Sequence, residues 1–332
     1  MVKSVKSVSK SDSKINFDSI NYKELLTKLL TEKGTISAVY SAFYTYSFQN
    51  QCLAMWQLEK RGMGITPVLP KSKWAEKGRT VKANAEPIYL CQPRLVKYEK
   101  EELNKETGKK EKVEKSFTKF IYSPLWYSYD QTSGKDLLAE PSKLPNFDFD
   151  KALAKFKIEL VDYNSLDGNC QGYALVKENK IALNPMAGHK DMTLLHEMAH
   201  CLLKHADVDF HSFHLVSLKF KLEKELKEKY DYEKADKQTK KELDAKIKEE
   251  IENNKRKLEA KAKSYEHCLK EVEAEATAFI IGSILGIDEE TLSDSRGYVQ
   301  NWFGSHKNIP EENSQRIIRT VDKMLKVGLV KS

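Results

Sequence analysis

Two histidines and a glutamate stand at the spacing of a metal-binding helix. His196, Glu197 and His200 belong to the run His-Glu-Met-Ala-His. On a helix, residues i and i+4 lie one above the other, so the two imidazoles can bind one tetrahedral metal ion. The glutamate can act as catalytic general base toward water that the metal activates. The run predicts a divalent-metal site, with Zn²⁺ favoured and another ion such as Mn²⁺ as the alternative.

A third ligand is expected from the segment KEVEAEATAF, residues 270–279. Glu271 and Glu275 are again i and i+4 and share one helix face, whereas Glu273 points away from it. Acidic side chains on a mostly buried helix need partners, which a metal and its histidines supply. We assign Glu271 as the ligand and Glu275 as the hydrogen-bond partner of a ligand imidazole, with the reverse assignment as the alternative.

Other possible donors near this helix receive no role. Thiolates suit zinc, but Cys201 lies about 100° round the helix from His200. We therefore interpret Cys201 and Cys268 as buried apolar residues. Three further histidines follow in a weaker pattern and are predicted to lie on the surface: His205, His211 and His214.

The elements that position these residues are predicted to be mostly helical. Residues 216–264 carry a dense Lys/Glu pattern with regularly spaced apolar residues, which predicts one or two long exposed helices, as an insert. We expect two strands of the second half, at 172–176 and 180–183, to form a pair beside the metal helix. One of them should lie at a sheet edge, where an extended peptide can bind as an additional strand. The second half is predicted to contain strands at 172–176 and 180–183, and helices near 148–157, 189–204, 265–285, 295–304 and 311–327.

The first half changes character after residue 60. Apolar spacing predicts helices over 18–31 and 35–60. Two β-prone runs follow, Ile88 to Val96 and Phe117 to Trp126. Residues 99–115 between them are almost entirely polar or charged, which suggests a solvated hairpin loop. The turn-rich stretch 130–148 then marks a domain boundary.

The positive charge is concentrated in one stretch. The chain carries 56 Lys or Arg and 49 Asp or Glu, a net charge of +7. Residues 60–97 hold nine basic and two acidic residues, and this difference equals the whole excess. A local excess of this kind points to a polyanion, because each cation that neutralises a phosphate releases a counterion.

Aromatic residues lie among these cations, as in proteins that stack the bases of single-stranded nucleic acid. The alternative is that Trp74 and Tyr89 belong to the core and the lysines only solubilise the chain. The residues predicted to contact single-stranded DNA are Tyr46, Asn50, Lys71, Lys73, Trp74, Lys77, Arg79, Lys82, Tyr89 and Arg94.

Composition narrows the class of protein. With 332 residues, two domains are expected. The longest apolar stretch, Ala278 to Ile287, is too short to span a bilayer, and the N-terminus lacks the apolar region of a signal peptide. Five scattered cysteines form no pair motif, which favours a reducing compartment. We therefore expect a cytoplasmic protein without a membrane partner.

Several segments together are similar to one known family. They are YSFQNQ (46–51), KWAEKGRTVKANAEPIYLCQP (73–93), SYDQTSGK (128–135), GYALVKENKIALN, LLHEMAH, KEVEAEATAF and RGYVQNWF. With these segments the chain resembles the ArdC-type antirestriction proteins, especially relatives in mobile elements of Gram-positive bacteria. The resemblance covers nearly the whole chain except its tail and its insert. It implies an N-terminal single-stranded-DNA-binding domain and a C-terminal zincin-like metallopeptidase domain.

One departure concerns the DNA-binding half. The family usually has a glycine-glutamate-lysine turn where this chain has Asn84-Ala85-Glu86, so a basic residue is missing there. The charged insert also lengthens the distance between His200 and Glu271 to 71 residues.

The expected architecture is therefore α+β. A disordered basic tail at 1–16 precedes an α/β single-stranded-DNA-binding domain at 17–145. A mostly helical, zincin-like domain with a small antiparallel sheet follows at 146–332. Two other functions remain open: an intracellular metalloprotease whose N-terminal domain recognises a protein, and a DNA-binding protein whose metal only stabilises the fold. A peptide or protein substrate is expected only if the metal centre is active.

Overall fold

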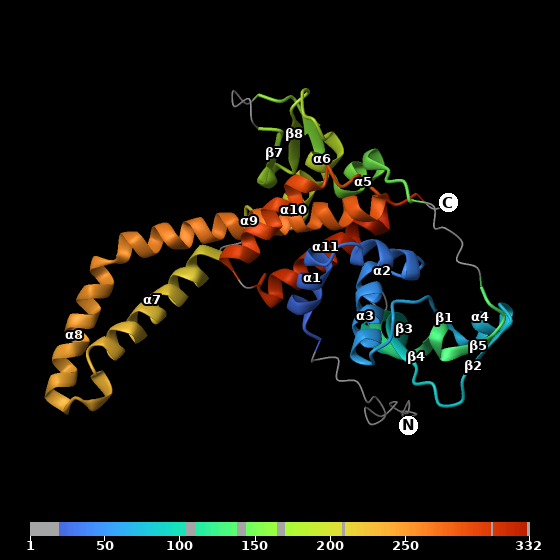
Figure 1. Ribbon diagram of the computed structural model, residues 1–332, viewed down its shortest axis with the longest axis horizontal. Coiled ribbons are helices and arrows are strands. Elements are labelled where there is room, and N and C mark those ends of the chain that lie inside the picture. Colours follow the sequence, from blue (N-terminus) through green and yellow to red (C-terminus); the bar gives the residue numbers. More distant parts are fainter. Residues whose placement is uncertain are drawn as a thin grey trace. The chain divides into compact units, whose positions relative to one another are not determined.

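The protein has a mixed α+β fold of long helices and small sheets, as the sequence predicts (Figure 1). The computed structural model describes residues 20–103, 110–137, 144–164, 170–207, 210–306 and 308–330. The predicted tail at 1–16 lies outside them. Two compact units are present: Met1–Leu25 with Ser37–Ser142, and Leu26–Ile36 with Lys143–Ser332.

The helices of the first half are shorter than their apolar pattern suggests. Helix α1 spans Tyr22–Thr31, and the predicted helix over 35–60 is two helices, α2 (Thr35–Phe43) and α3 (Phe48–Lys60). Residues 44–47 form a turn, and the Ser47 side chain accepts a hydrogen bond from the backbone of Asn50 to cap α3. A serine at this position stabilises a helix start, which explains the break.

The first unit contains two small antiparallel sheets. Strands β1 (Val68–Pro70), β4 (Lys110–Ser128) and β3 (Ile88–Leu103) form one sheet in the order β1-β4-β3. Strands β2 (Arg79–Val81) and β5 (Thr132–Gly134) form the other. Helix α4 (Lys71–Glu76) lies between β1 and β2 in the chain, and a short 3-10 helix, η2 (Tyr129–Gln131), joins β4 to β5.

Helix α3 covers the free edge of β3 with two side-chain amides. Asn50 donates to the carbonyl of Cys91 and accepts from its N–H. Gln57, two turns later, makes the same pair of bonds with the backbone of Tyr89. Unpaired backbone groups at a strand edge would otherwise need water or another chain, so these amides complete the sheet.

The prediction of a long solvated loop at 99–115 is wrong. Strands β3 and β4 continue through most of it, in one unbroken antiparallel register from Tyr89↔Pro124 to Leu103↔Lys110. Only residues 104–109, outside the described residues, separate the two strands. The ribbon is exposed on both sides along this part, so the sequence shows no alternation of apolar and polar residues.

The second unit begins with helix α5 (Phe149–Phe156) and a three-stranded sheet. The predicted strand pair is present as β7 (Gly172–Leu175) and β8 (Lys180–Leu183), joined by η3 (Val176–Glu178). A strand that the sequence did not reveal, β6 (Glu159–Val161), pairs in parallel with β8. The order is β6-β8-β7, so β7 lies at an edge.

Long helices complete the second unit. Helix α6 (Lys190–Leu202) carries the histidine motif. The charged insert forms α7 (Phe210–Lys229), a 3-10 turn η4 (Tyr232–Lys234), α8 (Lys237–Asn253) and the first part of α9, and α7 packs along α9 (Figure 1). Helix α9 (Lys255–Leu285) continues into the core, where it packs against α6, α10 (Ser293–Ser305) and α11 (Glu311–Gly328).

Two glycines allow close packing around α6. A Cβ at Gly172 would lie 2.9 Å from the Thr193 side chain, so β7 approaches the helix more closely than another residue would allow. A Cβ at Gly282 on α9 would lie 2.7 Å from the Met192 sulfur. The edge strand and the long helix therefore both lie against the helix that carries the histidines.

None of the described helices is long and apolar enough to cross a membrane. All five cysteines are free thiols.

Candidate metal centre

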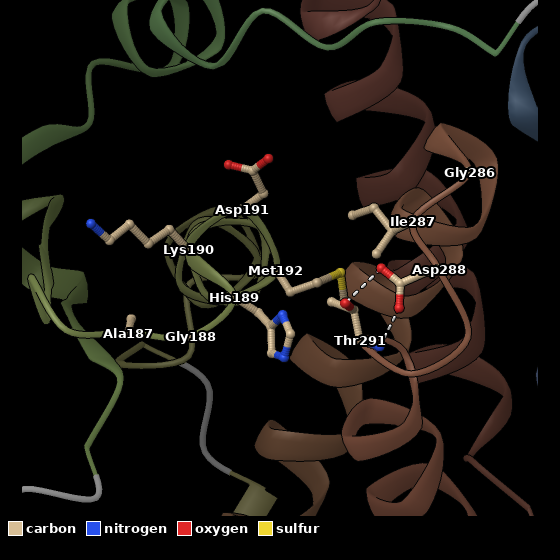
Figure 2. Close-up of a pocket in the computed structure, with 10 residues that line it drawn as sticks. All are labelled: Ala187, Gly188, His189, Lys190, Asp191, Met192, Gly286, Ile287, Asp288 and Thr291. Carbon is tan, nitrogen blue, oxygen red and sulfur yellow. Dashed lines mark hydrogen bonds between the residues drawn. The ribbon is translucent and has the colours of Figure 1, made fainter.

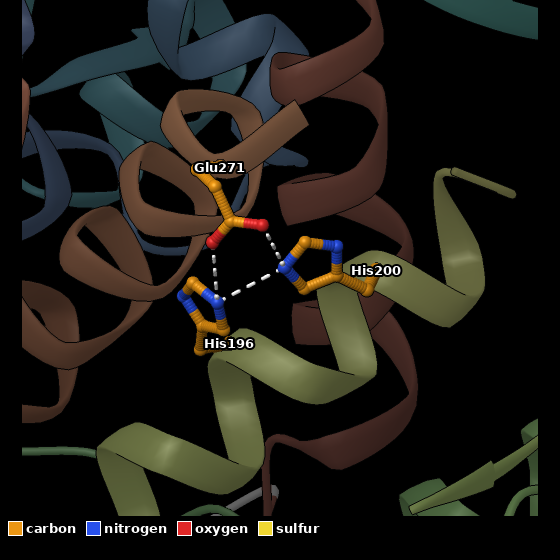
Figure 3. Close-up of side chains that lie close together, drawn as sticks. All are labelled: His196, His200 and Glu271. Atoms are coloured by element: carbon orange, nitrogen blue, oxygen red, sulfur yellow. Dashed lines mark hydrogen bonds and ion pairs between the residues drawn. The ribbon is translucent and has the colours of Figure 1, made fainter. Parts of the chain in front are cut away.

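Helices α6 and α9 bring His196, His200 and Glu271 together (Figure 3). The two histidine Nε2 atoms are 3.0 Å apart. The carboxylate of Glu271 faces both rings, with one oxygen 3.5 Å from His196 Nε2 and the other 3.6 Å from His200 Nε2. Ligand atoms of the three residues all lie within 4.8 Å of one another, which is the arrangement of a candidate metal site.

The spacing of these donors fits a tetrahedral ion. Zinc binds imidazole nitrogen and carboxylate oxygen at roughly 2.0–2.2 Å, so neighbouring tetrahedral ligands lie about 3.3 Å apart. The two histidine nitrogens are 3.0 Å apart, and each lies 3.5–3.6 Å from a different oxygen of the Glu271 carboxylate, so the separations are close to that value. Three protein ligands also leave the fourth position open, as in catalytic rather than structural zinc sites. The group can hold a divalent metal ion.

The two other acidic residues of the prediction lie beside this group. Glu275, one turn after Glu271, lies 3.3 Å from Nδ1 of His196, on the side of the ring opposite the donor atom. Glu197 is buried on α6, and burial raises the pKa of its carboxyl group. Glu271 faces the donor nitrogens and Glu275 faces the back of one ring, so the geometry favours Glu271 over Glu275 as ligand.

The carboxylates beside His196 favour positive charge on its ring. Burial opposes protonation of His196, but the contacts with Glu271 and Glu275 outweigh it and raise the pKa of this histidine to about 10. Burial also acts to raise the pKa of Glu271, yet the two histidines hold it well below its usual range. The carboxylates thus require positive charge between the helices, and a divalent ion supplies more of it than a proton does.

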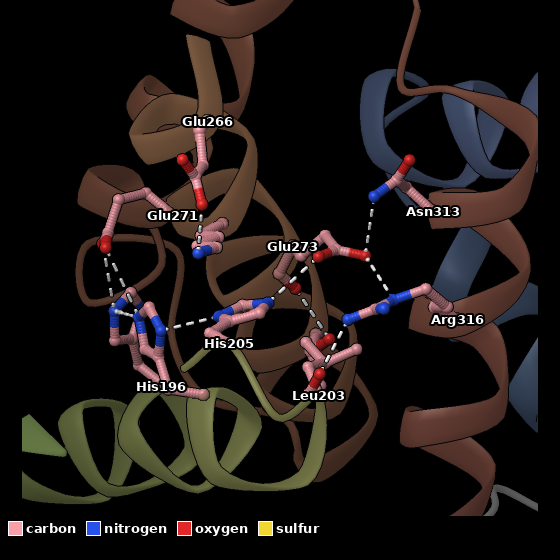
Figure 4. A network of polar contacts seen from close by, with 11 residues as sticks. His196, Leu203, His205, Glu266, Glu271, Glu273, Asn313 and Arg316 are labelled. Atoms are coloured by element: carbon pink, nitrogen blue, oxygen red, sulfur yellow. Dashed lines mark hydrogen bonds and ion pairs between the residues drawn. The ribbon is translucent and has the colours of Figure 1, made fainter. Parts of the chain in front are cut away.

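A chain of hydrogen bonds continues from His200 away from the metal position. Figure 4 shows its further members, His205, Glu273, Asn313 and Arg316. Nδ1 of His200 is 2.7 Å from Nδ1 of His205, and Nε2 of His205 is 3.0 Å from a carboxylate oxygen of Glu273. The other oxygen of Glu273 accepts hydrogen bonds from Asn313 and from Arg316, both at 3.1 Å.

This chain of hydrogen bonds corrects one sequence prediction and agrees with another. His205 is buried rather than on the surface, because Lys204 adopts the left-handed conformation and turns the chain back so that His205 reaches His200. Glu273 does point away from the metal face, but it is 0% exposed and forms an ion pair with Arg316 on α11. The side chains of His211 and His214 lie outside the described residues.

The chain of bonds fixes which nitrogen of His200 is free. The carboxylate of Glu273 accepts, so Nε2 of His205 carries a hydrogen. Burial lowers the pKa of His205 and keeps its ring neutral, and Nδ1 is then an acceptor. His200 must donate from Nδ1, which leaves the lone pair of Nε2 directed at the metal position.

We expect His205→Leu to weaken metal binding by about 10- to 100-fold, the usual effect of removing a hydrogen-bond partner of a metal-binding histidine. Competition with a chromophoric chelator measures the affinity. His189→Leu, at the exposed start of α6, is the matched control. Equal metal affinity in folded His205→Leu and in the wild type would contradict the role assigned to His205.

Three other residues near the site bear on the sequence predictions. Cys201 is buried, as predicted, and burial raises the pKa of its thiol to about 11, which disfavours a thiolate ligand. Cys268 is only half-buried, contrary to prediction. Tyr298, in the RGYVQNWF segment, was not predicted; burial and the charge of Glu271 raise its pKa, so its phenol keeps its proton.

A cavity of about 610 Å³ lies at the N-terminal end of α6, between residues 187–192 and the turn that follows α9 (Figure 2). Its lining includes Met192, one turn before His196, but none of the three ligand candidates. The metal group therefore lies outside this cavity.

In the first unit, Trp74 and Arg79 are not available to nucleic acid, contrary to prediction. Trp74 is fully buried, and its indole N–H donates to the carbonyl of Tyr127 at 2.8 Å. Arg79 is also buried: its guanidinium donates to Thr132 and lies 3.8 Å from the centre of the Tyr129 ring. Both residues connect α4 and β2 to the strands that follow, which is a structural role.

Four more of the residues predicted to contact DNA have partners within the protein. Asn50 covers the edge of β3, as described above. The hydroxyl of Tyr46 donates to the carbonyl of Val68, and its ring packs edge-on against Trp126. Lys73 pairs with Glu76, and Lys82 donates to the carbonyl of Asp130. Tyr89 is half-buried; Lys71, Lys77 and Arg94 are exposed on the surface.

Trp74→Ala is expected to destabilise the protein by about 3–5 kcal/mol, the usual cost of truncating a buried tryptophan. Chemical denaturation followed by circular dichroism measures it. Tyr44→Ala, at an exposed aromatic residue, should change stability by less than about 0.5 kcal/mol. A stable Trp74→Ala variant that loses only nucleic-acid binding would restore the original prediction.

Comparison with known proteins gives few matches. No protein-family model matches the chain, and no curated protein matches it. Among solved structures, the metal-free antirestriction protein ArdC from the R388 plasmid is similar at 14% identity and a TM-score of 0.38, over 92% of this chain and 96% of that chain. The Mn(II)-bound structure of ArdC from the same plasmid gives 12% identity and a TM-score of 0.40 over the same shares. The assignment of the metal centre rests on its own geometry.

Proposed function

We propose that this chain is an antirestriction-type protein of a mobile genetic element, with a metallopeptidase-like centre in its second unit and a single-stranded-DNA-binding surface in its first. The observation that carries the metallopeptidase-like centre is the group of His196, His200 and Glu271, whose ligand atoms all lie within 4.8 Å of one another. The sequence segments that resemble ArdC-type proteins support the antirestriction role.

The residues around the group suit hydrolysis of a peptide bond. A divalent ion held there would polarise a carbonyl and activate water. Glu197 lies next to His196 in a buried position where its raised pKa suits it to accept a proton from water and pass it to a leaving amine. Tyr298 keeps its proton near Glu271 and Glu275 and can donate a hydrogen bond to a developing negative charge.

The sheet offers a place for an extended peptide. Among the described strands, β7 pairs only with β8, so an extended peptide could add to its other edge as a further strand. The strand packs against α6 through Gly172 and Thr193. A peptide added there would run beside the helix that carries the histidines.

Cleavage of an internally quenched peptide library tests the hydrolytic part. The protein loaded with Zn²⁺ or Mn²⁺ should cleave a subset of peptides, a chelator should stop cleavage, and added metal should restore it. A metal-loaded protein that cleaves no peptide in the library would favour the alternative of a purely structural metal. A protein that cleaves peptides but does not bind single-stranded DNA would favour a metalloprotease whose first unit recognises a protein.

A further inference from the structure

Arg316 connects helix α11 to both helices that carry the metal-ligand candidates (Figure 4). Its Nε donates to a carboxylate oxygen of Glu273 on α9 at 3.1 Å. One of its terminal nitrogens donates to the carbonyl of Leu203, at the end of α6, at 2.7 Å. Helix α11 contributes none of the three ligand candidates, so Arg316 can affect the metal position only through other residues.

The contact with Leu203 fixes the turn that leads to His205. A carbonyl at the C-terminal end of a helix has no partner within the helix and carries partial negative charge, which suits a guanidinium group. Lys204 then adopts the left-handed conformation, with a φ of 53°, and His205 follows directly. Holding the Leu203 carbonyl therefore holds the backbone from which the His205 ring extends.

The contact with Glu273 fixes the group to which His205 donates. One carboxylate oxygen of Glu273 accepts from Asn313 and from Arg316, each at 3.1 Å, and the other oxygen lies 3.0 Å from Nε2 of His205. A carboxylate group is planar, so two donors to one oxygen determine the direction of the other. Asn313 and Arg316 are three positions apart on α11 and share one face of it. This face of α11 therefore sets the orientation of the Glu273 side chain, which is buried.

We propose that Arg316 is a positioning residue of the metal centre. It holds the Leu203 turn and the Glu273 carboxylate, and these two place the His205 ring. The ring in turn accepts from Nδ1 of His200 and leaves Nε2 of His200 directed at the metal position. The proposal rests on the metal centre of the function proposed above and assigns part of its affinity to a helix that contributes no ligand candidate.

The test must separate positioning from stability, because losing one partner of a buried ion pair destabilises a fold by itself. Arg316→Lys keeps the charge, but one terminal nitrogen on a flexible chain cannot hold two separate acceptors as the planar guanidinium does. Arg319→Lys is the matched control, because Arg319 lies on the same helix, is exposed and donates to Gln315.

Competition with a chromophoric chelator for Zn²⁺ measures the affinity of each full-length variant. Arg316→Lys should bind Zn²⁺ about tenfold more weakly than the wild type, the low end of the usual effect of changing the contacts behind a metal-binding histidine. Arg319→Lys should bind as the wild type does. Wild-type affinity in folded Arg316→Lys would overturn the proposal.

The same change in the His205→Leu background distinguishes positioning from general support of the fold. His205 transmits the effect of Arg316 to His200, so once His205 is replaced, Arg316→Lys should cause no further loss of Zn²⁺ affinity. A tenfold loss in both backgrounds would show that Arg316 only supports the fold, which would also overturn the proposal. Circular dichroism of the metal-free proteins shows whether each variant is folded.

Asn313→Ala is a second variant that keeps the proposal testable if Arg316→Lys does not fold. It removes one of the two donors to the same oxygen of Glu273 while the ion pair with Arg316 remains. It should weaken Zn²⁺ binding in the wild-type background and leave it unchanged in the His205→Leu background. The opposite pattern, or no effect in either background, would show that α11 does not act through Glu273.

Titration of the wild type separates failure of this inference from failure of the proposed function. A folded wild type that binds no Zn²⁺ would make the metal centre wrong, and the role of Arg316 with it. A wild type that binds Zn²⁺, with Arg316 and Asn313 variants that bind equally well, would exclude only that role. A protein that binds Zn²⁺ as expected but cleaves no peptide would refute the hydrolytic function and support the positioning role, because the measurement is binding.

Discussion

Replacing Glu197 with glutamine is expected to reduce metal-dependent peptide cleavage by about 10²- to 10⁴-fold, the usual contribution of a general base. Glutamine has the same shape but accepts no proton from water. His196, His200 and Glu271 remain unchanged, so the variant should hold metal as the wild type does. The measurement is the cleavage rate of a peptide selected from the quenched library, with metal content determined on the same sample.

Glu178→Gln is the matched control for this variant, because Glu178 is exposed and lies between β7 and β8 in the same unit. It should cleave at the wild-type rate. A Glu197→Gln variant with wild-type activity would remove Glu197 from the chemistry. A variant that loses metal as well as activity would show that Glu197 supports the site rather than the reaction.

His196→Ala and His200→Ala are each expected to lower bound metal from about one ion per chain to near zero, because two of three protein ligands cannot retain the ion. Elemental analysis of the purified protein measures the content. Metal that binds only the folded state stabilises it, by about 2.7 kcal/mol at 100 times the dissociation constant. Both variants should therefore lose the rise in melting temperature that added metal causes in the wild type.

Metal uptake should also depend on pH. The carboxylates around His196 raise its pKa to about 10, so near neutral pH the metal must displace a proton from this ring. Affinity should fall as the pH falls, and titration calorimetry in buffers of different ionisation enthalpy should detect proton release. His189→Ala, on the same helix but outside the ligand group, should bind metal normally. Full metal content in His196→Ala would contradict the assigned ligands.

The centre of the site could be predicted because its geometry is local. His196 and His200 lie one turn apart on one helix, and Glu271 and Glu275 repeat this spacing on another, so periodicity alone indicates which side chains share a face. The helical insert between the two pairs does not alter either local pattern. The structure brings Glu271 to both histidines although it lies 71 positions after His200.

The residues that continue the hydrogen-bond chain from His200, which are His205 and Glu273, could not be predicted. Their contacts depend on a turn and on partners that are distant in sequence. His205 reaches His200 only through the left-handed turn at Lys204, a conformation that is uncommon for lysine. Glu273 faces α11, and its partner Arg316 is 43 residues away. One signal in the sequence could have indicated a role for Glu273. It lies between Glu271 and Glu275 on a mostly buried helix, where a carboxylate needs a partner.

In the first unit, composition located positive charge but not the surface that presents it. Arg79 and Trp74 lie in the most basic stretch, yet tertiary contacts bury both. The exposed ribbon was mistaken for a loop, because neither of its faces there is buried and its sequence lacks the alternation that marks a half-buried strand.

Crystallographic anomalous scattering at the zinc or manganese absorption edge, on crystals grown with that metal, tests the central claim most directly. The expected result is one strong peak per chain, about 2.0–2.2 Å from Nε2 of His196, Nε2 of His200 and a carboxylate oxygen of Glu271, with Glu275 on Nδ1 of His196. A metal-saturated crystal with no peak between these residues, or with its peak bound by a different set of side chains, would contradict it.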